Sequence, residues 1–128
     1  DDRATAEKLL SAAGPVVWFD DEAQLDAVTA ISGSGPAYVF HMVEALAAAG
    51  KKLGLPDTIA EQLARQTVIG SAALLEADPA SPAELRQNVT SPNGTTAAGL
   101  AVLMEGLTPL IERTAEAARK RSEELGRA

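Results

Sequence analysis

The sequence contains no cysteine and a single histidine, His41. These absences exclude disulfides, thiolate nucleophiles and cysteine- or histidine-rich metal sites, so we expect no bound metal. Aromatic residues make up only 3% of the chain, whereas about one residue in five is alanine. A chain that is poor in aromatic and β-branched residues but rich in Ala, Leu, Glu and Arg favours closely packed helices over a large sheet.

Basic residues are outnumbered as well, since 11 Lys and Arg against 18 Asp and Glu give a formal charge of −7. A negative chain repels polyanions on average, so nucleic acid is not an expected partner. The sequence also lacks a long apolar run and a basic start that leads into one, and we therefore expect a cytoplasmic protein without a membrane partner. With 128 residues, 46% of them hydrophobic, the chain is long enough for one domain with a sizeable core.

The spacing of apolar residues predicts an all-α fold with one strand near the beginning of the sequence. Residues 3–13 fit a short amphipathic helix, and the β-branched and aromatic run Val16–Phe19 fits a strand. A single strand cannot satisfy its own hydrogen bonds. We therefore interpret residues 1–19 as the tail end of a neighbouring domain and residues 20–128 as a helical domain.

Helical spacing resumes after Asp20, and the run Ser32-Gly33-Ser34-Gly35-Pro36 is expected to kink this helix. Nearly every residue from Ala37 to Ala49 is apolar, which is typical of a helix buried on all sides. A second copy of the chain is the simplest cover for such a helix, so we expect a homodimer. Further helices are predicted up to about Glu76, from a capping box at Ser81–Glu84, after residues 90–96, and from Thr108-Pro109 onward.

Two loops could carry chemistry, and residues 90–96 (Thr-Ser-Pro-Asn-Gly-Thr-Thr) are the first. This composition permits a tight turn that leaves backbone N–H groups pointing outward at the positive end of the next helix. Such a site suits a small anion such as a carboxylate, and the hydroxyls of Thr95 and Thr96 could hold a polar substrate atom. The alternative is a threonine N-cap after an ordinary turn, and spacing alone does not decide between the two.

The second loop, Ser32–Pro36, could cradle a phosphate, but it lacks the strand-then-helix setting of a dinucleotide-binding motif and the lysine of a P-loop. A packing kink, in which small residues let two backbones approach, is the favoured interpretation. His41, with Glu44 three residues further along the same apolar helix, is interpreted as a core histidine that is hydrogen-bonded to its surroundings.

Taken together, the two loops resemble a known family. Residues 26–38 (DAVTAISGSGPAY) resemble the segment that opens the C-terminal domain of pyrroline-5-carboxylate reductase, and residues 89–100 (VTSPNGTTAAGL) resemble a characteristic loop and helix of that family. The likeness extends from about Ala6 to Leu125. It implies a helical bundle that interlocks as a dimer, similar to the C-terminal domain of 6-phosphogluconate dehydrogenase, behind a Rossmann domain.

The resemblance also implies an oxidoreductase that reduces 1-pyrroline-5-carboxylate to L-proline, the last step of proline biosynthesis. Its cofactor would be NADPH or NADH, bound mainly by the preceding Rossmann domain. No GxGxxG motif occurs in this sequence. We therefore expect the 128-residue chain to be inactive by itself, and residues 1–19 to be the last helix and strand of that Rossmann domain.

By motif, the resemblance places Ser91, Gly94, Thr95 and Thr96 around the small imino-acid substrate. The N–H groups of the loop and the Ser91 side chain would bind the carboxylate, and the Thr96 hydroxyl, as the catalytic group, would reach the imine nitrogen. The cofactor-proximal residues would be Ser32, Gly33, Ser34, Gly35 and Pro36.

The sequence departs from the family pattern at two places. Asn93 stands where the family usually has glycine, and because asparagine tolerates positive φ we expect the loop to survive. Residues 105–109 stand where the family has a Gly-Gly pair with an aromatic residue and Arg, and they are one residue shorter. Two alternatives stay open: a non-catalytic helical oligomerisation module, suggested by Asn93, and a reductase of a related small cyclic imino acid.

Overall fold

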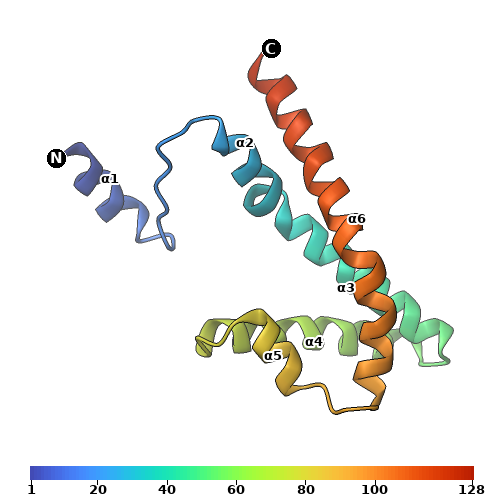
Figure 1. Cartoon of the computed structure of the whole chain (residues 1–128). Coiled ribbons are helices and arrows are strands. Elements are labelled where there is room, and N and C mark those ends of the chain that lie inside the picture. The colour runs from blue at the N-terminus through green and yellow to red at the C-terminus, as the bar shows by residue number, and fades with distance from the viewer.

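Helices dominate the computed structural model, which describes all 128 residues. The elements in chain order are α1 (Asp2–Leu10), α2 (Gln24–Val28), the π-helix η1 (Thr29–Gly33), α3 (Gly35–Lys52), α4 (Asp57–Ala77), α5 (Pro82–Asn88) and α6 (Thr95–Gly126) (Figure 1). The predicted all-α fold is confirmed. None of the helices combines the length and the apolar character that a membrane crossing requires.

The strand predicted at Val16–Phe19 is absent, and this part of the prediction was wrong for the chain by itself. Residues 15–19 belong to no regular element, and Val17 is 70% exposed. A strand needs a neighbour to complete its hydrogen bonds, and no other segment pairs with this one. Helix α1 lies apart from the other helices in Figure 1; the Arg3 guanidinium, 4.6 Å from the centre of the Trp18 ring, joins it to this segment.

A kinked helical run joins α2, η1 and α3. Pro36 has no N–H group, and in a regular α-helix its ring would clash with the carbonyl of Ser32. The chain widens here into a π-helix, in which the Ser34 N–H donates to the Thr29 carbonyl at 2.8 Å. The predicted kink is confirmed, but the close backbone approach is not, because no atom lies within 4 Å of a Cβ built on Gly35.

Small residues pack α3 tightly against α4. Ala60 and Ala64 of α4 are 2% and 5% exposed. A Cβ built on Gly50 of α3 would lie 3.2 Å from the Ala60 Cβ and 3.3 Å from the Leu55 Cδ1. Gly54, with a φ of 95°, forms the left-handed turn that lets α4 fold back onto α3.

We expect Gly50→Ala to lower the free energy of unfolding by about 1–2 kcal/mol, because the added methyl group overpacks this contact. Gly126→Ala is the matched control, since nothing lies within 4 Å of a Cβ there and alanine favours a helix over glycine. Urea unfolding at a fixed protein concentration measures both effects. Equal midpoints for the Gly50→Ala variant and the unsubstituted protein would contradict the tight packing.

One helix of 32 residues, α6, replaces the two helices that were predicted on either side of Thr108-Pro109, with Pro109 inside it. The predicted helix start was therefore wrong. Proline removes one N–H···O bond, whereas ending a helix leaves four N–H or four C=O groups to be satisfied at each new terminus. The residues before Thr108 supply no turn that would satisfy them, so the helix continues.

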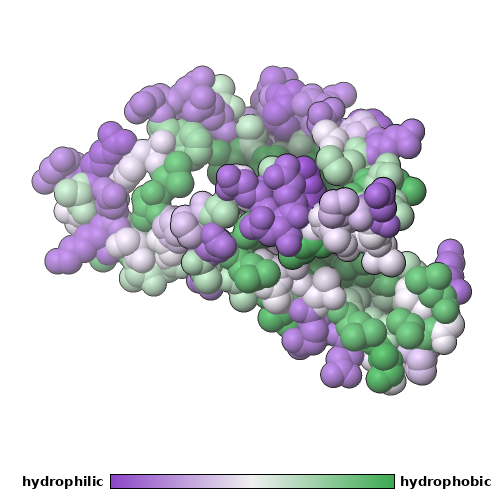
Figure 2. Space-filling model, turned by 60° about the horizontal axis from the view of Figure 1, so that its bottom comes forward, coloured by the Kyte–Doolittle hydropathy of each residue, from purple (hydrophilic) through white to green (hydrophobic).

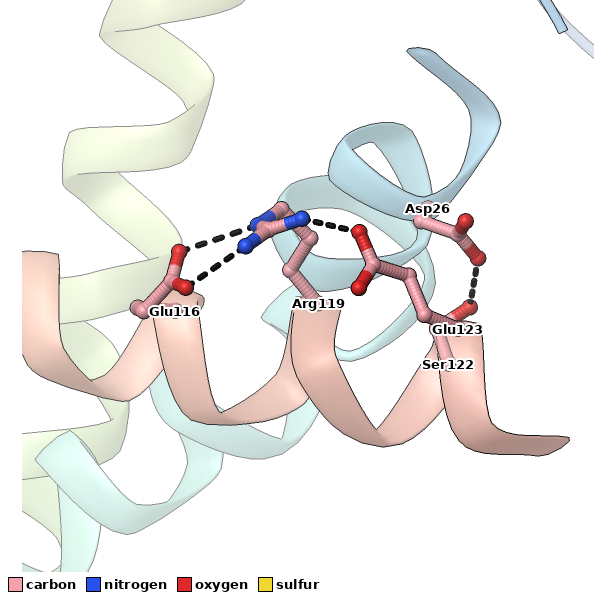
Figure 3. Close-up of polar contacts among 5 residues, drawn as sticks. All are labelled: Asp26, Glu116, Arg119, Ser122 and Glu123. Atoms are coloured by element: carbon pink, nitrogen blue, oxygen red, sulfur yellow. Dashed lines mark hydrogen bonds and ion pairs between the residues drawn. The ribbon is translucent and has the colours of Figure 1, made fainter. Parts of the chain in front are cut away.

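Polar contacts join the C-terminal part of α6 to α2 (Figure 3). The Ser122 hydroxyl donates to Asp26 Oδ1 at 2.6 Å, across a separation of 96 residues. Arg119 donates to both carboxylate oxygens of Glu116, at 2.6 and 2.9 Å, and also contacts Glu123. Its hydrogen bonds lower the pKa of the Glu116 carboxyl and raise the pKa of Arg119 itself. This part of α6 is thereby held beside α2 and η1.

The chain encloses almost no core of its own. Its buried residues are Ala30, Ala47, Ala60 and Ala64, while large side chains such as Phe40 of α3, at 69%, are exposed. The accessible surface is 10117 Å², more than half as large again as the about 6,400 Å² expected for a compact protein of this mass. Figure 2 shows apolar residues spread over the visible face. Helix α3, predicted to be buried on all sides, therefore has much of its apolar surface open to a partner.

Candidate functional site

The turn between α5 and α6 contains the first predicted site, and α5 is fixed at both ends. The predicted capping box forms, because the Glu84 N–H donates to Ser81 Oγ at 3.2 Å and the Ser81 N–H donates to Glu84 Oε2 at 2.9 Å. At the other end the Thr90 hydroxyl donates to the Arg86 carbonyl at 2.5 Å. The turn therefore starts from a well-defined position.

Asn93 adopts a φ of 59°, and it is the one residue other than glycine with a positive φ. Asparagine reaches this left-handed conformation more readily than most residues. The turn then closes when the Gly94 N–H donates to the Ser91 carbonyl at 3.1 Å. Asn93 is therefore compatible with the loop, as the sequence predicted.

Gly94 allows the Ser91 side chain to lie against the beginning of α6. A Cβ at position 94 would lie 2.5 Å from Ser91 Oγ and 3.2 Å from the Ser91 carbonyl oxygen, so any side chain there would displace the Ser91 hydroxyl. The φ of Gly94 is −84°, so the glycine is required for space and not for backbone conformation. The Ser91 hydroxyl is thus placed beside the N-terminus of α6.

No side chain caps that N-terminus, because the N-cap residue is Gly94 itself. The threonine N-cap considered as an alternative is therefore wrong. The Ala98 N–H donates to the Gly94 carbonyl at 3.2 Å, but the N–H groups of Thr95, Thr96 and Ala97 make no hydrogen bond within the chain. The side chains of Thr95 and Thr96 are exposed, so their hydroxyls are accessible to a ligand.

The structure thus brings together Ser91, Gly94, Thr95 and Thr96 around a group of free donors. Three N–H groups at the positive end of a long helix can bind an anion of carboxylate size. The neighbouring hydroxyls can donate or accept a hydrogen bond at a second polar atom of the same ligand.

The Ser32–Pro36 segment does not join this group of residues. Helix α6 rises about 40 Å between Thr95 and Ser122, and Ser122 is bonded to Asp26 in the helix that leads into η1. Residues 90–96 precede the N-terminus of α6, whereas the run between α2 and α3 passes beside the middle part of that helix (Figure 1), so the two predicted sites lie apart. The Ser34 N–H is already bonded to Thr29 and proline has none, so the segment offers no open cradle for a phosphate. The residues of this chain alone do not fit a dinucleotide.

His41 is hydrogen-bonded to Glu44, with 2.8 Å between His41 Nδ1 and Glu44 Oε2. The two side chains are 81% and 75% exposed, so the prediction of a core histidine was wrong for the chain by itself. Both residues lie on α3, whose large apolar side chains are also exposed to solvent.

Comparisons with known proteins agree on one family. The family model described as pyrroline-5-carboxylate reductase dimerisation matches residues 22–125. A pyrroline-5-carboxylate reductase of Pseudomonas aeruginosa is 50% identical over 121 residues, which are 94% of this chain and 44% of that protein.

Solved structures of two such reductases have the same fold. The enzyme from Coxiella burnetii gives a TM-score of 0.91 at 43% identity, covering 98% of this chain and 47% of that one. The enzyme from Plasmodium falciparum, solved with NADP bound, gives a TM-score of 0.82 at 32% identity, covering 98% of this chain and 48% of that one. This chain spans about half the length of these relatives. It belongs to the pyrroline-5-carboxylate reductase family, in the part that the family model describes as the dimerisation domain.

Proposed function

We propose that this chain is the dimerisation and substrate-binding half of a cytoplasmic reductase that converts 1-pyrroline-5-carboxylate to L-proline with NADPH or NADH. The observation that carries the proposal is the turn before α6, which leaves three N–H groups and two threonine hydroxyls free at one helix N-terminus. The substrate presents a carboxylate and an imine nitrogen on one small ring. The two kinds of donor match these two groups.

The N–H groups of Thr95, Thr96 and Ala97, with the Ser91 hydroxyl beside them, hold the carboxylate. Hydrogen bonds to a charged acceptor are stronger than those between neutral groups. The helix dipole of α6 adds a local attraction for a negative ligand. This attraction matters because the chain as a whole is negatively charged.

The Thr96 hydroxyl acts at the other polar group of the substrate. Addition of a hydride to the imine carbon breaks the C=N double bond and leaves its electron pair on the nitrogen, which takes up a proton to become the secondary amine. A threonine hydroxyl is too weak an acid to supply that proton unaided, so it orients the nitrogen and a relaying water. The cofactor, when bound to the complete protein, supplies the hydride.

The proposed site takes residues from two chains. The carboxylate loop precedes the N-terminus of α6, whereas the Ser32–Pro36 segment belongs to the kinked run between α2 and α3, which packs against α6 further along that helix, so the two can border one substrate only if they come from different copies. The open apolar surface of α3 supports a homodimer. Residues 1–19 belong in this proposal to the preceding nucleotide-binding domain, which would cover Val16–Phe19.

The experiment that tests this function is oxidation of NADPH and of NADH by the complete protein, offered 1-pyrroline-5-carboxylate. We expect turnover by the complete protein and none by the 128-residue chain. A folded dimer without turnover on either cofactor would contradict the proposal and favour a non-catalytic oligomerisation module. Turnover confined to a six-membered cyclic imino acid would instead favour the related reductase.

A carboxylate titration tests the substrate loop without the cofactor. L-Proline added to the 128-residue chain should shift the amide signals of Gly94, Thr95 and Thr96 in an NMR spectrum. Pyrrolidine, the same ring without the carboxylate, is the control and should leave these signals in place.

A further inference from the structure

Tyr38, the only tyrosine of the chain, makes a contact that the proposed carboxylate loop does not use. Its hydroxyl donates to the backbone carbonyl of Ala30 at 3.0 Å. Ala30 lies in η1 and is 1% exposed, where η1 packs against α3 and α6. The bond therefore runs from the first turn of α3 back across the kink to the π-helix.

The hydroxyl takes the place of a missing helical donor. In a regular α-helix the Ala30 carbonyl would accept from the Ser34 N–H, four residues later. Here the Ser34 N–H is bonded to the Thr29 carbonyl instead, at 2.8 Å. A buried carbonyl without a donor is unfavourable, so the Tyr38 hydroxyl stabilises the π-helix against the regular α-helical alternative.

We propose that Tyr38 is a positioning residue, which holds η1 in its π conformation and so places Ser32–Gly35 for the nicotinamide end of the cofactor. The proposal rests on the proposed function, together with the resemblance to the reductase family that makes Ser32–Pro36 the cofactor-proximal segment. Without the hydroxyl, the segment interconverts between the π register, with the Ser34 N–H on the Thr29 carbonyl, and the α register, with it on the Ala30 carbonyl, and each interconversion opens the Ser34 N–H to solvent. That one-residue change of register turns the helix before the kink by about 100° relative to α3.

Tyr38→Phe in the complete protein tests this role, because it removes the hydroxyl and keeps the ring. We expect the KM for the reduced dinucleotide to rise about five- to tenfold, a change typical of one lost hydrogen bond. The KM for 1-pyrroline-5-carboxylate should change less than about twofold, since the carboxylate loop lies at the far end of α6. Thr114→Val is the control, because it removes another hydroxyl-to-carbonyl bond, 2.8 Å to Leu110, outside the kink.

Hydrogen exchange supplies a readout that does not depend on turnover. The Ser34 amide should exchange at least about tenfold faster in Tyr38→Phe than in the unsubstituted protein, and Thr114→Val should not change it. An unchanged Ser34 amide would overturn the proposal. Faster exchange without a selective rise in the KM for the dinucleotide would also overturn it, because Tyr38 would then be structural only. No turnover by the unsubstituted protein would contradict the proposed function, and with it the positioning role, whatever the Ser34 exchange rate.

Discussion

Thr96→Val in the complete protein is expected to lower kcat about a hundredfold, the size of effect typical when one positioned donor is removed from an active site. Valine keeps the shape and β-branching of threonine but cannot hydrogen bond to the imine nitrogen or to a relaying water. The hydroxyl makes no contact within the chain that folding would lose, because no side chain caps α6. Steady-state NADPH oxidation measures the effect, and thermal unfolding should show a nearly unchanged midpoint.

Thr108→Val is the matched control for this substitution. Thr108 is also an exposed threonine of α6, and it lies more than three helical turns from the carboxylate loop. Its substitution should leave kcat within about twofold of the unsubstituted enzyme, a small change in barrier height. If Thr96→Val lost no more activity than Thr108→Val, the catalytic role of the Thr96 hydroxyl would be refuted.

Gly94→Ala is expected to raise the KM for 1-pyrroline-5-carboxylate at least about tenfold. The added Cβ would lie 2.5 Å from Ser91 Oγ and 3.2 Å from the Ser91 carbonyl oxygen, so the Ser91 hydroxyl must turn away from its place beside the free N–H groups and the turn is crowded. The φ of −84° suits alanine, which leaves the steric contact as the cause. Gly99→Ala, also in α6 but with nothing within 4 Å of the new Cβ, should leave the KM unchanged.

A double variant separates the steric contact from a direct effect on binding. Ser91→Ala removes the oxygen that the new methyl group meets and also removes one proposed carboxylate ligand. Adding Gly94→Ala to Ser91→Ala should therefore raise the KM by less than about threefold, far less than Gly94→Ala does in the unsubstituted enzyme. If the KM of the double variant rose by the product of the two single effects, the contact with Ser91 Oγ would not be the cause of the Gly94→Ala effect.

Local sequence signals identified those elements whose causes are local. The capping box of Ser81 and Glu84 forms because both partners lie within one helical turn. The kink before α3 follows from the missing N–H of Pro36. Pro109 shows the limit of such signals. Whether a proline starts a helix or lies inside one depends on whether the residues before it form a turn that satisfies the backbone groups of a helix end. The unpaired run Val16–Phe19 shows another, since a strand exists only when a second segment lies beside it.

In the candidate site, too, local features were predictable from the sequence and features that depend on the whole fold were not. The tight turn at residues 90–96 was predictable, because Ser, Pro, Asn and Gly before a helix favour it, whereas the assignment of Ser91, Gly94, Thr95 and Thr96 to a substrate came from the family resemblance and stays a prediction. The separation of this loop from Ser32–Pro36 was not predictable, because it depends on the unbroken length of α6. The role of Tyr38 was also hidden, since a bond between its side chain and the Ala30 carbonyl follows from the π-helix and not from any pattern of residue types.

The burial pattern leads to the central claim, that the 128-residue chain folds only as part of a dimer. Ala30, Ala47, Ala60 and Ala64 alone are buried, and so few small residues cannot offset the conformational entropy of folding. Sedimentation equilibrium of the chain at micromolar concentration tests this claim most directly. We expect a helical species with twice the chain mass of 13.2 kDa. A helical, cooperatively melting monomer of 13.2 kDa would contradict the claim.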